Sequence, residues 1–235
     1  MKIIKDYLFE TEVPIEYKQK FWYHGTFHSN AIKIIKSCKL KPIENPDNGY
    51  MSPIAGKVYL TSRLDEGLIY AFYRACNQEE NPKYAYLVIV KGEDLVDILP
   101  DEDIIANLLP KLYYSNDNLS KNEINKFIYK NSDLTKDEIN KFIYLNKLAK
   151  ETDSKLYHKY HIKGNYEYGT ALGKKIIKLI NDDQKIDLIN YGQKIANDGC
   201  IPIYQVWEIP VDKRNEINKN IDSFQFYSKL LYSSY

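Results

Sequence analysis

A histidine, a glycine and two tyrosines occur in an order that could hold a flat, polar ligand. His24 and Gly25 stand near the end of an aromatic, strand-like segment, residues 20–26. There a side chain and an exposed backbone can face a ligand together, and a glycine lets the chain lie against a planar group because it has no Cβ. Tyr59 and Tyr70 follow, eleven residues apart. Two tyrosine rings from neighbouring elements could sandwich a flat aromatic ring.

Alternating strands and helices must position these residues. Aromatic and apolar runs predict strands over 20–26, 57–61 and 84–90, and the last is apolar throughout, which is typical of a central strand. Ser29 and Ser62 are expected to cap helices that end near Leu40 and Cys76. The prolines and glycines of residues 41–56 predict a long loop.

The second half of the chain differs from the first in composition and in the spacing of its apolar residues. Residues 101–196 are rich in Lys, Asn, Ile and Leu at helical spacing, which predicts a helical insertion. A strand over 200–210 and a helix from about Asn215 follow. The sequence therefore predicts an α+β fold in one domain over 1–235, with a split sheet built from the two ends of the chain and flanked by helices.

Charge and composition disfavour binding to nucleic acid or to an anionic membrane. The 33 basic and 32 acidic residues give a formal charge of +1, so no global field attracts nucleic acid or an anionic membrane. Arg63, Arg74 and Arg214 are the only arginines. Guanidinium groups that read bases or grip phosphate are therefore scarce.

Cysteines and histidines give no metal site or disulfide framework. Cys38, Cys76 and Cys200 are sparse and far apart, and His158 and His161 lack a third ligand of suitable spacing. The charged N-terminus is unlike a signal peptide, and no run approaches the roughly 20 apolar residues of a spanning helix. We expect a cytoplasmic protein with no metal and no membrane partner.

The order of these pieces resembles the ADP-ribosyltransferase superfamily, in its diphtheria-toxin and poly(ADP-ribose) polymerase branch. The resemblance covers residues 20–92 well, residues 198–212 weakly and the helical middle not at all. The motifs that carry it are His24-Gly25-Thr26, the helix ending near Leu40, Gly49-Tyr50-Met51, Val58-Tyr59-Leu60-Thr61 and Tyr70. The stretch from Val58 to Asp65 is also similar to the small rifampicin-modifying members.

The resemblance implies NAD⁺ as the substrate and assigns roles to the matching residues. His24 would hydrogen-bond the adenosine ribose, and the Gly25 backbone would pair with the nicotinamide carboxamide. Tyr59 and Tyr70 would stack on the nicotinamide ring. Thr26 and Thr61 complete the NAD-binding set, and His24 and Tyr59 belong to the catalytic set.

The acidic residue of the family has two candidates here. The family places it on or just before a late strand, and residues 200–208 form the late strand that the sequence predicts. Glu208 lies on that strand and Asp198 just before it, whereas one alignment puts Cys200 at the acidic position. We favour Glu208 over Asp198, and the register stays open.

Three functions follow from the sequence. The first is an enzyme that transfers ADP-ribose from NAD⁺ to a macromolecular acceptor, a protein rather than a nucleic acid, and releases nicotinamide. The second is ADP-ribosylation of nucleic acid or an activity like that of the RNA 2′-phosphotransferases. The third is a catalytically degenerate module that binds NAD⁺ or a partner. A restraining partner, an antitoxin or a hydrolase, is left open by the sequence.

Overall fold

The computed structural model describes residues 13–42, 44, 54–108, 136–163 and 166–234. The chain divides into two compact units. The first, which we call the sheet unit, comprises residues 1–45, 55–99 and 193–235, and the second, the helical unit, comprises 46–54 and 100–192. The residues predicted to be catalytic or to bind NAD⁺ all belong to the sheet unit.

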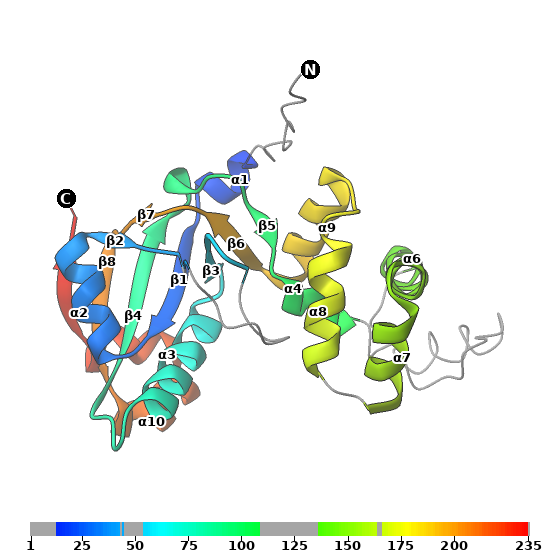
Figure 1. Cartoon of the computed structure of the whole chain (residues 1–235). Helices are drawn as coiled ribbons and strands as arrows, with labels where there is room; N and C mark the ends of the chain where they lie inside the picture. Colours follow the sequence, from blue (N-terminus) through cyan, green and yellow to red (C-terminus); the bar gives the residue numbers. More distant parts are fainter. Residues whose placement is uncertain (1–12, 43, 45–53, 109–135, 164–165, 235) are drawn as a thin grey trace. The chain divides into compact units, whose positions relative to one another are not determined.

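A seven-stranded sheet forms the sheet unit, in the order β5-β6-β3-β1-β4-β8-β9 (Figure 1). Its neighbours from β6 to β9 pair antiparallel. The strands are β1 (Phe21–Thr26), β3 (Lys57–Thr61), β4 (Tyr84–Lys91), β5 (Leu99–Pro100), β6 (Lys194–Asp198), β8 (Gln205–Pro210) and β9 (Lys229–Ser233). A separate two-stranded sheet joins β2 (Lys39–Leu40) to β7 (Ile201–Pro202).

The pairing between β1 and β3 is much shorter than the other pairings of these strands. All six residues of β1 pair with β4, and all five residues of β3 pair with β6. Between β1 and β3 the one registered pair is Tyr23 with Thr61. Residues 24–26 of β1 and 57–60 of β3 lie beyond this pair, where no β1–β3 pair is registered, and we call this stretch the β1–β3 opening.

Side-chain alternation divides the sheet into two faces. Thr26, Tyr86 and Glu208 are paired across β1, β4 and β8 and share one face with His24. This face carries α2 (His28–Ser37), whose first residue contacts Tyr86. We call it the α2 face.

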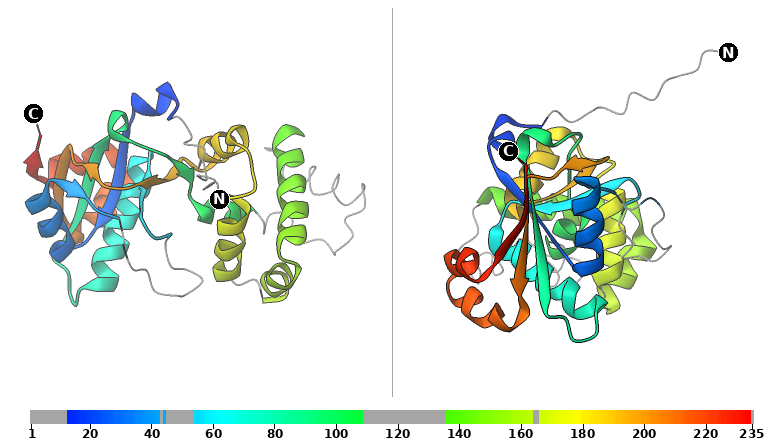
Figure 2. Two further views of the ribbon diagram at one scale, coloured as in Figure 1. Left: turned by 45° about the horizontal axis from the view of Figure 1, so that its top comes forward. Right: turned by 90° about the vertical axis from the view of Figure 1, so that its left-hand side faces the viewer.

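The opposite face carries α3 (Leu64–Gln78), α10 (Arg214–Lys219) and α11 (Phe224–Tyr227). Buried apolar side chains of these three helices, including Leu68, Phe72, Ile217 and Phe224, form one core cluster with Leu87 of β4. We call this the α3 face. The right-hand view of Figure 2 shows α2 on one side of the sheet and the C-terminal helical turns on the other.

The helical unit is built from α4 (Glu102–Leu108), α6 (Lys136–Thr152), α7 (Ser154–Lys163), α8 (Tyr166–Ile176) and α9 (Asp182–Gly192). Gly169 and Gly173 of α8 permit close packing, because a Cβ would lie 2.9 Å from the Tyr160 ring and 2.4 Å from the Glu102 carbonyl oxygen. Tyr160 also donates a hydrogen bond of 3.0 Å to the carbonyl of Ala106. No helix among the described residues combines the length and apolar character needed to cross a membrane.

The α+β organisation and most of its elements agree with the sequence. Residues 57–61 form β3 as predicted, and β4 is buried from Ala85 to Val90, which confirms a central strand. The predicted caps are wrong. Ser29 lies inside α2, which begins at His28, and the Ser62 hydroxyl donates to Gln193 Oε1 instead of capping α3.

The late part of the sheet also differs from the prediction. The helical unit ends at residue 192, not 196, because residues 194–198 form β6 with three buried side chains. The prediction of a single late strand over 200–210 is therefore wrong, since β7 and β8 divide these residues and β6 precedes them. A final strand, β9, was not predicted. Asp198 is the last residue of β6.

The tight contact between β1 and α3 gives the first testable prediction. A Cβ at Gly25 would lie 2.1 Å from the backbone nitrogen of Ala71, and a helix backbone cannot move aside locally. We expect Gly25→Ala to lower the free energy of unfolding by about 1–3 kcal/mol through overpacking. Denaturant titration measures this, with the exposed Ser29→Ala as the control. A Gly25→Ala protein as stable as the wild type would contradict the packing described here.

Candidate functional site

His24 lies at the β1–β3 opening and contacts the backbone of β3. Its ring Nδ1 is 3.0 Å from the carbonyl oxygen of Tyr59. A carbonyl only accepts hydrogen bonds, so Nδ1 carries the proton and Nε2 presents a lone pair. No described residue hydrogen-bonds Nε2, and His24 keeps partial exposure. The imidazole can therefore accept a hydrogen bond from a hydroxyl of a ligand.

The electrostatic surroundings keep His24 neutral. Burial lowers the pKa of His24, the hydrogen bond to the Tyr59 backbone opposes this shift, and the charge of Arg74 lowers the pKa further. A neutral ring with a fixed Nδ1 proton is an acceptor of one defined orientation. That is the form needed to position a sugar hydroxyl.

Gly25 lies beside Tyr70 because β1 packs directly on α3. An added Cβ would approach the Tyr70 carbonyl carbon to 2.5 Å. The sequence suggested that this glycine makes room for a planar ligand, but the structure gives it a packing role against α3. The contact still brings the backbone of β1 next to one of the two predicted stacking residues.

The two tyrosines come to the same face of the sheet. Thr61 hydrogen-bonds Glu66 of α3, so Tyr59, two residues earlier in β3, also lies on the α3 face. Tyr70 is on α3 itself, with 37 % of its surface exposed. Its hydroxyl accepts a hydrogen bond of 3.1 Å from Lys194 Nζ. The opening thus has His24 on one face and the two tyrosines on the other.

Thr26 and Thr61 are both buried and already engaged. Thr26 Oγ1 accepts a hydrogen bond of 2.7 Å from Asn30. Thr61 Oγ1 lies 3.0 Å from Glu66 Oε2 and 3.1 Å from the Gln193 carbonyl, so its single proton serves one of two acceptors. These contacts tie β1 to α2 and β3 to α3.

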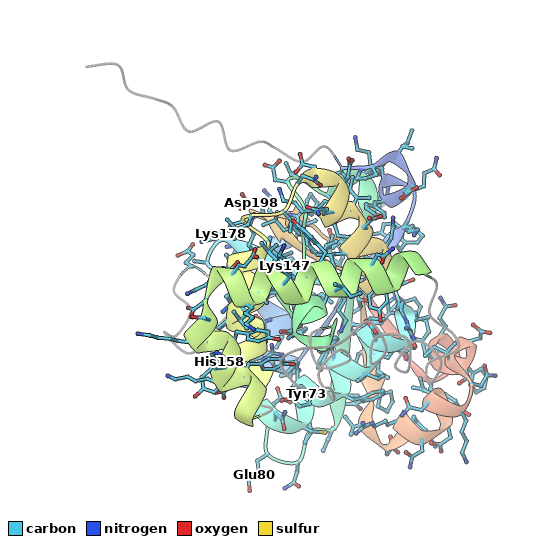
Figure 3. The ribbon with its side chains drawn as sticks, turned by 90° about the vertical axis from the view of Figure 1, so that its right-hand side faces the viewer. Tyr73, Glu80, Lys147, His158, Lys178 and Asp198 are labelled. Atoms are coloured by element: carbon cyan, nitrogen blue, oxygen red, sulfur yellow. The ribbon has the colours of Figure 1, made fainter. Side chains whose placement is uncertain are left out.

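The two predicted acidic residues lie on different strands, away from β1. Asp198 forms an ion pair of 3.4 Å with Lys57, its strand partner, and its side chain is 52 % exposed. It is one of the residues labelled in Figure 3. Glu208 lies two strands from β1 on the α2 face. From a strand spacing of about 4.8 Å, the Cα atoms of Glu208 and His24 are roughly 12 Å apart.

Glu208 belongs to a hydrogen-bonded chain that sequence reasoning missed. The buried Tyr86 hydroxyl donates to Glu208 Oε2 over 3.0 Å and lies 2.6 Å from His28 Nδ1, which donates to it in turn. Burial and the bond to Glu208 raise the pKa of Tyr86 far above its usual value, so it stays protonated. Strand register alone could not predict this series of hydrogen bonds, because His28 takes part only where α2 lies over β4.

Two further residues beside Tyr70 were also missed. Glu66 precedes Tyr70 by one helical turn on α3, and Lys194 of β6 reaches both side chains. Spacing of four residues on a helix was a signal for Glu66. No local pattern indicated Lys194, which is 124 residues from Tyr70 in the chain.

Other parts of the described chain hold fewer groups that could bind a ligand or take part in a reaction. No group of three or more His, Cys, Asp or Glu side chains within the described ranges could hold a metal ion. His158 lies on α7 (Figure 3), and the side chain of His161 is outside the described residues, as is Gly49-Tyr50-Met51. A hollow of about 480 Å³ belongs to the helical unit and is lined by Asp153, Lys155, Leu156, Lys159, Ala171, Lys174 and Lys175.

Comparison with known proteins gave no match among protein-family models, curated proteins or solved structures. The function therefore has to be argued from the residues themselves.

The lowered pKa of His24 predicts a pH-dependent contribution to stability. Because the folded-state pKa lies below that of the unfolded chain, near 6.5, the unfolded state binds more protons as the pH falls through this range. The wild type should lose stability below about pH 6.5. In His24→Asn, whose amide can still donate to the Tyr59 carbonyl, this component should vanish.

Urea titrations of both proteins from pH 7.5 to 5 measure the difference. Other titrating groups are common to both proteins and cancel. Equal pH slopes for the wild type and His24→Asn would contradict the assignment of a half-buried, neutral His24.

Proposed function

We propose that the protein is an NAD⁺-dependent ADP-ribosyltransferase that transfers ADP-ribose to a macromolecular acceptor, with release of nicotinamide. The observation that carries the proposal is the β1–β3 opening. His24 bonds the Tyr59 backbone there, and the backbone of Tyr70 lies against Gly25, with His24 on the α2 face and the two tyrosine side chains on the α3 face. The order of these residues along the chain resembles this superfamily. The divergence of β1 from β3 is also what a split sheet of that type requires.

The chemistry of NAD⁺ suits these groups. An Nε2 acceptor on His24 can orient a ribose hydroxyl, and tyrosine rings offer a stacking surface to the nicotinamide ring. Holding nicotinamide in place while the ribose moves lets the glycosidic bond stretch in a fixed geometry. A protein acceptor is favoured over a nucleic acid because the formal charge is +1 and arginines are few.

Nicotinamide release and label transfer test this function. The full chain is incubated with NAD⁺ labelled in the adenylate, with and without cell lysate, and label is followed in the protein and nucleic-acid fractions. We expect nicotinamide release and label on protein. Label confined to nucleic acid would favour the alternative acceptor, and the absence of both NAD⁺ binding and nicotinamide release would refute the proposal.

Substitution of a stacking tyrosine makes the test specific to the site. Stacking of a base on an aromatic side chain contributes about 1–3 kcal/mol to the free energy of binding. Tyr70→Ala should therefore raise the KM for NAD⁺ by about 5- to 150-fold. Tyr73→Ala is the matched control, because Tyr73 lies on the same helix (Figure 3) and is 58 % exposed. Similar kinetics for the two variants would argue against a stacking role for Tyr70.

A further inference from the structure

Cleavage of the bond between nicotinamide and ribose builds positive charge on the ribose, so the site needs a negative group close to that sugar. We propose that Glu66 is this carboxylate. The inference rests on the proposed function and concerns which acid serves it.

Glu66 lies on the same face as the stacking tyrosines. It is one turn before Tyr70 on α3, and side chains four residues apart on a helix are neighbours. Lys194 Nζ connects the two, at 3.8 Å from Glu66 Oε2 and 3.1 Å from the Tyr70 hydroxyl. A ring stacked on Tyr70 would therefore have its attached sugar within the surroundings of this carboxylate.

One carboxylate oxygen of Glu66 contacts Thr61 and Lys194, and the other is available to a ligand. The Thr61 hydroxyl is 3.0 Å from Oε2, and the carboxylate side chain is 23 % exposed. Oε1 accepts no hydrogen bond from the described residues, and the nearest cation, Arg63 Nη1, is 3.9 Å away. Arg63 itself forms its short contacts with Asp65, at 2.6 and 3.2 Å. Oε1 is thus an oriented acceptor open to a ribose hydroxyl.

The other two acids are less suitable by position. Glu208 is on the α2 face and holds Tyr86, whereas the tyrosines are on the α3 face. Asp198 shares the α3 face, but it ends β6, is half exposed and pairs with Lys57. Solvent screens an exposed carboxylate, which weakens its effect on a developing charge.

The reaction needs no reactant other than NAD⁺ and the acceptor. The bond between ribose C1′ and the nicotinamide ring nitrogen breaks, and its electron pair goes to that nitrogen, so nicotinamide leaves as a neutral molecule. A nucleophilic atom of the acceptor forms the new bond to C1′ and loses its proton to solvent. Glu66 exchanges no proton in this step, and its carboxylate stabilises the positive charge of the transition state.

Matched neutral substitutions separate the three acids. Glu66→Gln keeps an oxygen that can accept from Thr61 but removes the charge, and Glu208→Gln and Asp198→Asn are the controls. At saturating NAD⁺ we expect Glu66→Gln to lower kcat for nicotinamide release by about 100- to 1,000-fold, the usual effect of losing a preorganised electrostatic group. KM should change much less. The controls should keep kcat within a few-fold of the wild type.

A conservative variant distinguishes charge from structure. Glu66→Asp keeps the negative charge and should retain more of kcat than Glu66→Gln, while thermal unfolding reports whether either variant is misfolded. An active wild type with a fully active Glu66→Gln would overturn the role of Glu66 and leave the proposed function standing. A wild type that binds NAD⁺ but releases no nicotinamide would overturn both.

Discussion

The sheet unit depends on one constraint, that a backbone polar group removed from water needs a hydrogen-bond partner. Where β1 and β3 stop pairing after Tyr23 and Thr61, the His24 ring donates a hydrogen bond to the carbonyl of Tyr59. This bond fixes the tautomer and leaves Nε2 as an acceptor. One hydrogen bond therefore links the end of the β1–β3 pairing to the chemistry of the histidine.

The helix α3 provides the second half of the site through close packing. Gly25 lets α3 lie against β1, and Thr61 connects the end of β3 to Glu66 in the first turns of that helix. Tyr70 follows one turn later and is held by Lys194 from β6. Three strands and one helix thus converge on a small region of the α3 face, while the His28–Tyr86–Glu208 chain stabilises the α2 face. Glu66, the acid proposed for the reaction, belongs to the α3 face.

Local patterns in the sequence predicted the features that depend on interactions between residues close in the chain. The apolar run of β4 and the aromatic run of β1 predicted the two strands that they form, and the order His24, Gly25, Tyr59, Tyr70 indicated the candidate site. Long-range contacts were not predictable. Ser62 bonds Gln193 rather than its own helix, and β6 is a short strand that follows a long helical stretch. The pairing of Asp198 with Lys57 and of Glu208 with Tyr86 depends on strand order, which no spacing in the chain specifies.

The most direct test of the central claim is hydrogen–deuterium exchange of the full chain with and without NAD⁺. If NAD⁺ occupies the β1–β3 opening, it should slow exchange in residues 24–26 and in the first half of α3, and leave the pairing of β4 with β8 unchanged. Protection confined to other parts of the chain, with residues 24–26 and α3 unaffected at saturating NAD⁺, would contradict the account.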